Sequence, residues 1–176
     1  MTRALTWHPF TDRPDLVAAP VREALEGTPL AASVEVTEID PDLADTQALV
    51  DSTDVLLEES ANCIVVLGRR GEDERVAAGL VLATTRADVN STVRKRLDVR
   101  KASFMPMDRA VADTGMEYGG ITPVGLPDQW PVLVDSRVID SPRVVIGSGL
   151  RRSKLRLPGA LVADLPGVEV VEGLAR

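Results

Sequence analysis

The segment from Tyr118 to Gly125 constrains the fold most, because it holds three glycines and one proline within eight residues. Glycine lacks a Cβ and adopts positive φ, so this glycine loop can bring backbone N–H groups close to a ligand or to another strand. Pro123 fixes its own φ and directs Thr122 toward extended geometry. The sequence therefore predicts a stiff loop that either lines a small-ligand pocket or joins a helix to a strand.

Hydrophobic periodicity predicts both strands and helices along the chain. Two apolar runs, at residues 62–67 and 76–84, flank a charged connection and predict an antiparallel hairpin. Strands with helices inserted between them favour an α+β fold with a mixed sheet. Further strands are expected at residues 34–37, 101–105, 132–135, 144–146, 155–157 and 168–171. Helices are expected after caps at Asp45, at Asn90 or Ser91, and at Asp108, with Gly115 ending the last of these and another helix starting at Pro158.

The length of 176 residues suits a single domain with a sizeable core. Residues 1–30 carry several prolines and little periodicity, and Pro20 is well placed in a first helical turn. We therefore expect an irregular N-terminal extension with a short helix at residues 1–30 and the domain itself at residues 31–176.

The formal net charge of −7 restricts the nucleic-acid partners of the chain. A protein that binds duplex DNA is usually basic, because neutralisation of phosphates dominates its affinity. We therefore expect no duplex-DNA partner. Two basic clusters, at residues 94–101 and 151–156, either contact the end of an RNA or form solvated faces.

The rare residue types exclude several kinds of site. The single cysteine, Cys63, cannot form an internal disulfide, which favours a reducing compartment. His8 and Cys63 lack the companions that a zinc site needs, so we expect no metal and no cofactor. No apolar run is long enough to cross a bilayer, and the N-terminus lacks the apolar core of a signal peptide. The expected location is the cytoplasm, without a membrane partner.

Four segments carry a resemblance to a known family: a helix, glycine turn and GGxxPxG loop at Ala110–Leu126, a strand ending in aspartate at Pro131–Asp135, a strand and glycine turn at Val144–Gly149, and a strand at Ala61–Val66. In this order and spacing they resemble the YbaK family, also called the prolyl-tRNA-synthetase-associated editing domain. The resemblance spans roughly residues 33–171 and implies a mixed, strongly curved sheet flanked by helices.

The resemblance implies a free-standing deacylase that hydrolyses the ester between a mischarged small amino acid and the 3′ end of tRNA. The aminoacylated tRNA end would be the substrate, and an aminoacyl-tRNA synthetase would be a further partner. Oriented backbone N–H groups can polarise an ester carbonyl, each contributing about 3 kcal/mol to the transition state. The reaction therefore needs no Ser-His-Asp set.

We expect the catalytic site to combine Asn62, Gly120, Thr122 and Asp135, with Gly120 and Thr122 as the donors nearest the ester carbonyl. Asp135 would orient a water, hold the amino group of the substrate, or cap the following turn. The expected substrate-binding residues are Cys63, Gly119, Ile121, Pro123, Gly125, Gly147, Ser148 and Gly149. The expected tRNA contacts are Arg94, Lys95, Arg151 and Arg152.

Asn62 is the main departure from the family, which usually carries a lysine at this position. An asparagine side chain donates and accepts hydrogen bonds but brings no charge, and a charge-assisted contact is roughly twice as strong as a neutral one. Asn62 either orients substrate or water, or is a polar strand residue satisfied by backbone. The alternative function is therefore a non-catalytic module of the same fold that binds aminoacyl-tRNA or a synthetase. Hydrolysis of another small acyl ester is a third possible function.

Overall fold

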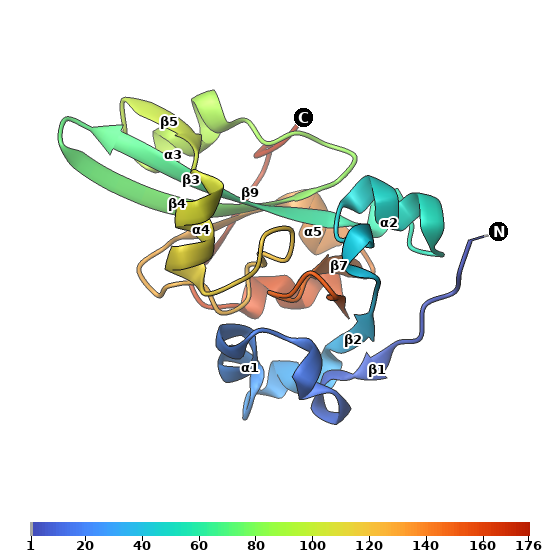
Figure 1. The fold of residues 1–176 in the computed structure, drawn as a ribbon. Coiled ribbons are helices and arrows are strands. Elements are labelled where there is room, and N and C mark those ends of the chain that lie inside the picture. The colour runs from blue at the N-terminus through green and yellow to red at the C-terminus, as the bar shows by residue number, and fades with distance from the viewer. Residues whose placement is uncertain (1) are drawn as a thin grey trace.

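Two β-sheets organise the chain in the computed structural model, which describes residues 2–176 (Figure 1). The four-stranded sheet has the order β1-β2-β8-β7, and the five-stranded sheet has the order β5-β3-β4-β6-β9. The strands are β1 (His8–Pro9), β2 (Glu35–Glu38), β3 (Ala61–Arg70), β4 (Asp73–Leu82), β5 (Lys101–Phe104), β6 (Val132–Asp135), β7 (Val144–Gly147), β8 (Ser153–Leu157) and β9 (Val168–Val171).

The larger sheet is mixed, since β6 runs parallel to both β4 and β9 while the other pairs are antiparallel. A bridge between Ser60 and Val145 brings the start of β3 beside β7 and so joins the two sheets. The predicted α+β fold with a mixed sheet flanked by helices is confirmed, with the expected curved sheet divided into these two parts.

Short helices cover the sheets, and within residues 2–176 none is long and apolar enough to span a bilayer. The α-helices are α1 (Ala19–Leu25), α2 (Thr46–Ser52), α3 (Arg94–Arg96), α4 (Met107–Thr114) and α5 (Ser136–Asp140). The 3₁₀ helices are Phe10–Asp12, Pro14–Leu16, Pro29–Ser33, Pro41–Leu43, Leu57–Glu59 and Gly159–Asp164, and a π-helical turn spans Val89–Val93.

Two of the predicted helix caps are wrong and one is confirmed. Asp45 caps α2 by accepting hydrogen bonds from the N–H groups of Gln47 and Ala48, as expected. Asp88, and not Asn90 or Ser91, caps the π-helical turn, because its carboxylate reaches the N–H three residues further along.

The helix predicted from Asp108 begins one residue earlier, at Met107, after an N-cap at Pro106. Asp108 thus lies inside the first turn, where its charge faces the positive end of the helix dipole instead of capping it. Gly115 ends α4 in the left-handed conformation with a φ of 67°, as expected.

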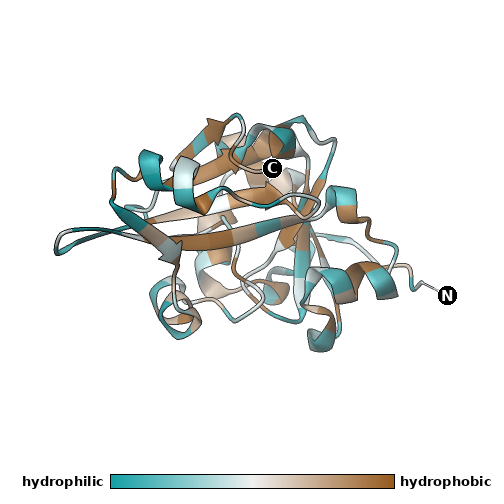
Figure 2. Ribbon diagram, turned by 90° about the horizontal axis from the view of Figure 1, so that it is seen from above, coloured by the Kyte–Doolittle hydropathy of each residue, from teal (hydrophilic) through white to brown (hydrophobic). Residues whose placement is uncertain are grey.

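The predicted hairpin is confirmed as β3–β4, but its strands are longer and its connection shorter than expected. Only residues 71–72 separate the strands, because the charged residues on either side stay in register and pair across the hairpin. Arg69 lies opposite Glu74, and their side chains form an ion pair of 2.9 Å. The hairpin therefore has an apolar centre and a polar tip (Figure 2).

Alternation along β3 divides its side chains between two sides of the five-stranded sheet. Ala61, Cys63 and Val65 face the side on which the glycine loop lies, where they join clusters that include Ile121. Val66 packs on the opposite side, in a cluster with residues of the π-helical turn. The register of β3 thus decides which of its residues can face the loop.

The N-terminal segment packs into the main hydrophobic core. Phe10, Leu16, Val21 and Leu25 are fully buried there, together with side chains from both sheets. The strand β1 also pairs with β2 at the edge of the smaller sheet. The division at residue 30 stays a sequence-based prediction, since the residues on both sides of it share one core.

This packing makes Gly125 a sensitive position. Its φ is 80°, and a Cβ there would collide with the carbonyl oxygen of Pro20. We expect Gly125→Ala to lower the free energy of unfolding by about 3 kcal/mol in urea denaturation. Gly71 is the matched control, because its φ is 65° but a Cβ there meets no atom within 4 Å. Gly71→Ala should cost only about 1 kcal/mol, and equal losses for both variants would contradict the packing argument.

Candidate functional site

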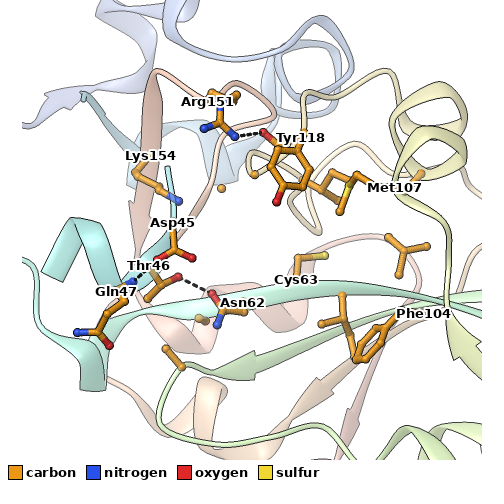
Figure 3. Close-up of a pocket in the computed structure, with 18 of the residues that line it drawn as sticks. Asp45, Thr46, Gln47, Asn62, Cys63, Phe104, Met107, Tyr118, Arg151 and Lys154 are labelled. Carbon is orange, nitrogen blue, oxygen red and sulfur yellow. Dashed lines mark hydrogen bonds between the residues drawn. The ribbon is translucent and has the colours of Figure 1, made fainter. Parts of the chain in front are cut away.

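A cavity of about 680 Å³ opens between the glycine loop and one edge of β3 (Figure 3). On that edge β7 approaches through the bridge at Ser60, and β5 pairs only from Val66 onward. The cavity occupies the gap between these two neighbours, and Ala61–Val65 form its floor. The helices α2 and α4 contribute to its two ends (Figure 1).

One end of the cavity is polar. Polar side chains enter it from the start of α2, from β3, from the β7–β8 turn and from β8. The capping bonds of Asp45 hold the first turn of α2 at this end. The polar lining residues are Asp42, Asp45, Thr46, Gln47, Asn62, Arg151 and Lys154. Both signs of charge are therefore present at this end of the cavity.

Lys154, on β8, is the buried charge of the polar end. Lys154 is only 8% exposed, and its Nζ donates a hydrogen bond to the carbonyl oxygen of Ala44 at 2.9 Å. Burial lowers the pKa of Lys154 to about 8, while Asp45 favours the charged form and Arg151 opposes it. Figure 3 shows the amine directed toward Asp45. The cavity therefore contains an ammonium group that loses its proton only slightly above neutral pH.

Asn62 lines the cavity at its polar end. Its side-chain oxygen accepts a hydrogen bond of 2.7 Å from the hydroxyl of Thr46. Successive residues of a strand direct their side chains to opposite sides, and Figure 3 shows Asn62 next to Thr46 while Cys63 points away from the strand into the cavity. Asn62 therefore reaches the cavity from its rim and binds α2, whereas Cys63 faces the glycine loop.

The other end of the cavity is mostly apolar. Its lining residues include Cys63, Phe104, Met105, Met107, Ala110, Tyr118 and Ile121. Desolvation raises the pKa of the Cys63 thiol to about 12, so the sulfur stays protonated at neutral pH and is no nucleophile. Phe104 and Tyr118 are 63% and 58% exposed, which leaves two aromatic side chains at the mouth.

Close backbone packing holds the glycine loop in place. The N–H of Gly149 donates to the carbonyl of Gly120 at 2.7 Å, and the N–H of Gly120 donates to Glu117 at 3.0 Å. A Cβ on Gly147 would lie 2.5 Å from the carbonyl oxygen of Gly120. The N–H of Gly120 is thus used inside the protein, and this group, which we expected near an ester carbonyl, is not free.

The other predicted residues of this region divide between the cavity wall and the layer behind it. Gly119, Ile121 and Gly147 line the cavity with Cys63. Behind the wall, Thr122 and Ser148 are fully buried, and Ser148 bonds to Ser153 at 2.7 Å. Gly120, Pro123, Gly125 and Gly149 also stand outside the lining and support the loop.

Asp135 lies away from the cavity lining, at the end of β6. Its carboxylate caps α5 through the N–H of Arg137, forms an ion pair with the Arg137 side chain and accepts the N–H of Ala175. Desolvation opposes ionisation, but these hydrogen bonds outweigh it and lower the pKa of Asp135. Of the three roles that the sequence left open, the geometry favours the cap.

The four predicted tRNA contacts do not form one surface. Arg151 lines the cavity mouth, where it lies over the ring of Tyr118 at 5.3 Å and donates to the carbonyl of Pro41. Arg152 donates to the carbonyl of Asp15. Arg94 and Lys95 lie on α3, next to residues that pack on the other side of β3. Of these four residues, only Arg151 lines the cavity.

Sequence reasoning missed Lys154 and Asp45 as site residues. Lys154 was grouped with a surface cluster, yet it is one of only three lysines and directly precedes the strand predicted at residues 155–157. Asp45 was identified only as a cap, although a capping carboxylate can also face a cavity. For metals, no three His, Cys, Asp or Glu side chains within residues 2–176 gather in a group that could hold an ion.

Comparisons with known proteins bear on this site. A family model described as the aminoacyl-tRNA editing domain matches residues 40–165. No curated protein matches the sequence. Solved structures that share the fold include a protein proposed to be a trans-editing enzyme for prolyl-tRNA synthetase, with a TM-score of 0.73 and 20% identity over 87% of this chain and 93% of that one.

Two further structures have a similar fold. A hypothetical protein has a TM-score of 0.72 and 19% identity over 89% of this chain and 99% of that chain. A structure from work on computational grafting of epitopes onto scaffold proteins has a TM-score of 0.73 and 21% identity over 88% of this chain and 95% of that chain. At these identities the structural matches show the fold alone.

The environment of Asp135 predicts a pH-dependent contribution to stability. Its pKa is lowered in the folded state, so its stabilisation is present above the unfolded value of 3.8 and is lost as the pH falls through the folded value. We expect Asp135→Ala to lower the free energy of unfolding by about 2 kcal/mol at pH 7, through the lost cap and the unpaired Ala175 N–H.

Asp135→Asn is the matched control, because it retains an acceptor but no charge. Denaturation at a series of pH values below 7 should show the gap between the wild type and this variant narrowing once the pH falls below 3.8. A gap that stays constant below this pH would argue against the charge as its cause.

Proposed function

The chain belongs to the aminoacyl-tRNA editing domain family, and on that premise we propose that it is a free-standing deacylase for tRNA carrying a mischarged small amino acid. The match to residues 40–165 confirms the resemblance found in the sequence. The observation that supports hydrolysis best is the buried ammonium of Lys154 inside the cavity beside the glycine loop. It supplies within the site a positive charge that Asn62 lacks.

The reaction is the attack of water on the ester carbonyl, which releases the amino acid and the ribose hydroxyl of the tRNA. Negative charge develops on the carbonyl oxygen in the transition state, and donors held in a dehydrated site stabilise it. Lys154 uses one N–H on Ala44, so its ammonium retains two N–H groups for this oxygen. The backbone N–H groups of Gly119 and Ile121, two loop residues that line the cavity, would be the further donors in this proposal.

The substrate enters through the cavity mouth. Arg151 and Tyr118 lie there, and a guanidinium and an aromatic ring suit the phosphate and base of a terminal nucleotide. We propose the aminoacylated 3′ end of tRNA as the partner, with a synthetase that produces the mischarged tRNA as a second one. Because mischarging occurs where tRNA is aminoacylated, the proposed location is the cytoplasm.

A panel of mischarged tRNAs tests the proposal directly. The purified protein should accelerate deacylation of at least one member of a set carrying alanyl, cysteinyl, prolyl and seryl esters. Release of labelled amino acid from each tRNA, corrected for spontaneous hydrolysis, is the measurement. If no ester in this set is hydrolysed faster than without protein, the deacylase proposal is wrong.

Replacing Lys154 tests the charge in the cavity. We expect Lys154→Met to lower kcat by on the order of 100-fold, because a donor to the developing oxyanion is lost. Lys154→Arg retains the charge and should keep a larger share of the activity. Lys101→Met removes an exposed lysine on β5 and controls for net charge, so its kcat should be unchanged. Equal kcat values for Lys154→Met and Lys101→Met would show that Lys154 does not take part in the reaction.

The pKa of Lys154 predicts how the rate depends on pH. Burial lowers that pKa to about 8, so the ammonium is lost as the pH rises through this value. The enzymatic part of kcat/KM should fall by more than about tenfold between pH 7 and pH 9.5. In Lys154→Arg the fall over the same range should be smaller, because the guanidinium remains charged. A wild-type rate that rises across this range would show that the free amine is the active form.

The alternative is a non-catalytic module of the same fold. Asn62 favours it, because its side chain is neutral and its oxygen is bound to Thr46. Saturable binding of aminoacyl-tRNA or of a synthetase with no turnover would select this alternative. Turnover of small acyl esters, with none of aminoacyl-tRNA, would select the third function.

A further inference from the structure

The gap along β3 leaves the backbone N–H and C=O of Cys63 without a strand neighbour. On this edge the bridge to Val145 ends the contact with β7, and the pairing with β5 begins at Val66. Past the end of β5, the N–H of Met105 donates to the carbonyl of Val65 at 2.8 Å. Cys63 stands between these contacts, and within residues 2–176 no strand pairs with it on this side.

The direction of the Cys63 peptide groups follows from strand geometry. Within one strand residue the N–H and C=O point to the same edge, and successive residues alternate between the two edges. The carbonyl oxygen of Ser60 accepts a hydrogen bond from the N–H of Ala83, on the β4 side. On the other edge, the carbonyl oxygens of Val65 and Arg69 accept hydrogen bonds from the N–H groups of Met105 and Arg100, respectively. Odd-numbered residues of β3 therefore direct both groups away from β4. The N–H and C=O of Cys63 open into the cavity that this residue lines.

We propose that the backbone N–H and C=O of Cys63 bind the α-amino acid part of the substrate. The N–H donates a hydrogen bond to the ester carbonyl, and the C=O accepts one from the α-ammonium. The inference rests on the proposed function, since it assigns a subsite within the same cavity. A free α-aminoacyl ester carries one cationic donor and one acceptor three bonds apart, which matches the donor and acceptor that one strand residue presents.

The surroundings of Cys63 support this occupant. Asp42 and Asp45 line the same cavity and supply negative charge for an ammonium group. The apolar end, with Met105 and Ile121, is available for the substrate's own side chain. The thiol of Cys63 is protonated at neutral pH, so the residue acts through its backbone and not as a nucleophile.

This subsite predicts selectivity for a free α-amino group. Acetylation of the α-nitrogen removes its charge and adds bulk to the group that the Cys63 carbonyl would bind. We therefore expect the wild-type protein to hydrolyse an N-acetylated aminoacyl-tRNA at least about tenfold more slowly than the matching free aminoacyl-tRNA.

A pair of substitutions at one position separates backbone from side chain. Cys63→Pro removes the N–H, and a strand tolerates proline where that N–H faces an open edge. Cys63→Ala removes the thiol and keeps the N–H. We expect the kcat/KM of Cys63→Pro to be lower than that of Cys63→Ala by on the order of tenfold or more. Circular dichroism and urea denaturation check that Cys63→Pro is folded.

Each outcome decides the proposal. Equal kcat/KM for folded Cys63→Pro and Cys63→Ala overturns it, as does equal wild-type hydrolysis of free and N-acetylated substrates. If Cys63→Pro does not fold, the N-acetyl comparison alone decides. If the wild type hydrolyses no ester, the proposed function fails separately. The subsite is then tested by calorimetry with a stable 3′-amide analogue of aminoacyl-adenosine. The affinity of the analogue with a free α-amino group is compared with that of its N-acetylated form, and equal affinities overturn the proposal.

Discussion

The backbone contact between the glycine loop and the turn after β7 is the constraint on which the site depends. Gly149 donates to the carbonyl of Gly120, and Gly147 lies so close to that carbonyl that a Cβ would clash. Two glycine segments far apart in sequence thus pack backbone against backbone, which no other residue type permits at these points. This contact holds the loop across from β3 and keeps the cavity open between them.

The cavity owes its chemistry to an interruption in a sheet. The strands β7 and β5 both lie along the same edge of β3, and the stretch between them is free to meet a ligand. Unpaired peptide groups are costly in a buried place, so a strand edge that stays open inside a protein suits a polar ligand. Lys154 and the acidic residues near α2 give this opening both signs of charge. An aminoacyl ester, with a cationic amine and a developing oxyanion, complements such a site.

Several elements could be predicted because local patterns decide them. Two apolar runs and the charged connection between them predicted the hairpin β3–β4, and Gly115 marked the end of α4. Helix starts were less predictable, since Asp88 and Pro106 hold positions that Asn90 or Ser91 and Asp108 were expected to take. Neighbouring cap-forming residues compete, and the path of the chain into the helix selects among them.

The sequence alone determined the α+β class, the stiffness of the glycine loop and the family, because glycine, proline and apolar spacing act on the backbone locally. Only the tertiary structure decided which polar groups share the cavity. Asp135 became a helix cap and Lys154 a buried amine, although the sequence made the first the more evident site residue. The physical reason is that burial and pairing across strands depend on contacts between segments distant in the chain, which spacing along the sequence does not specify.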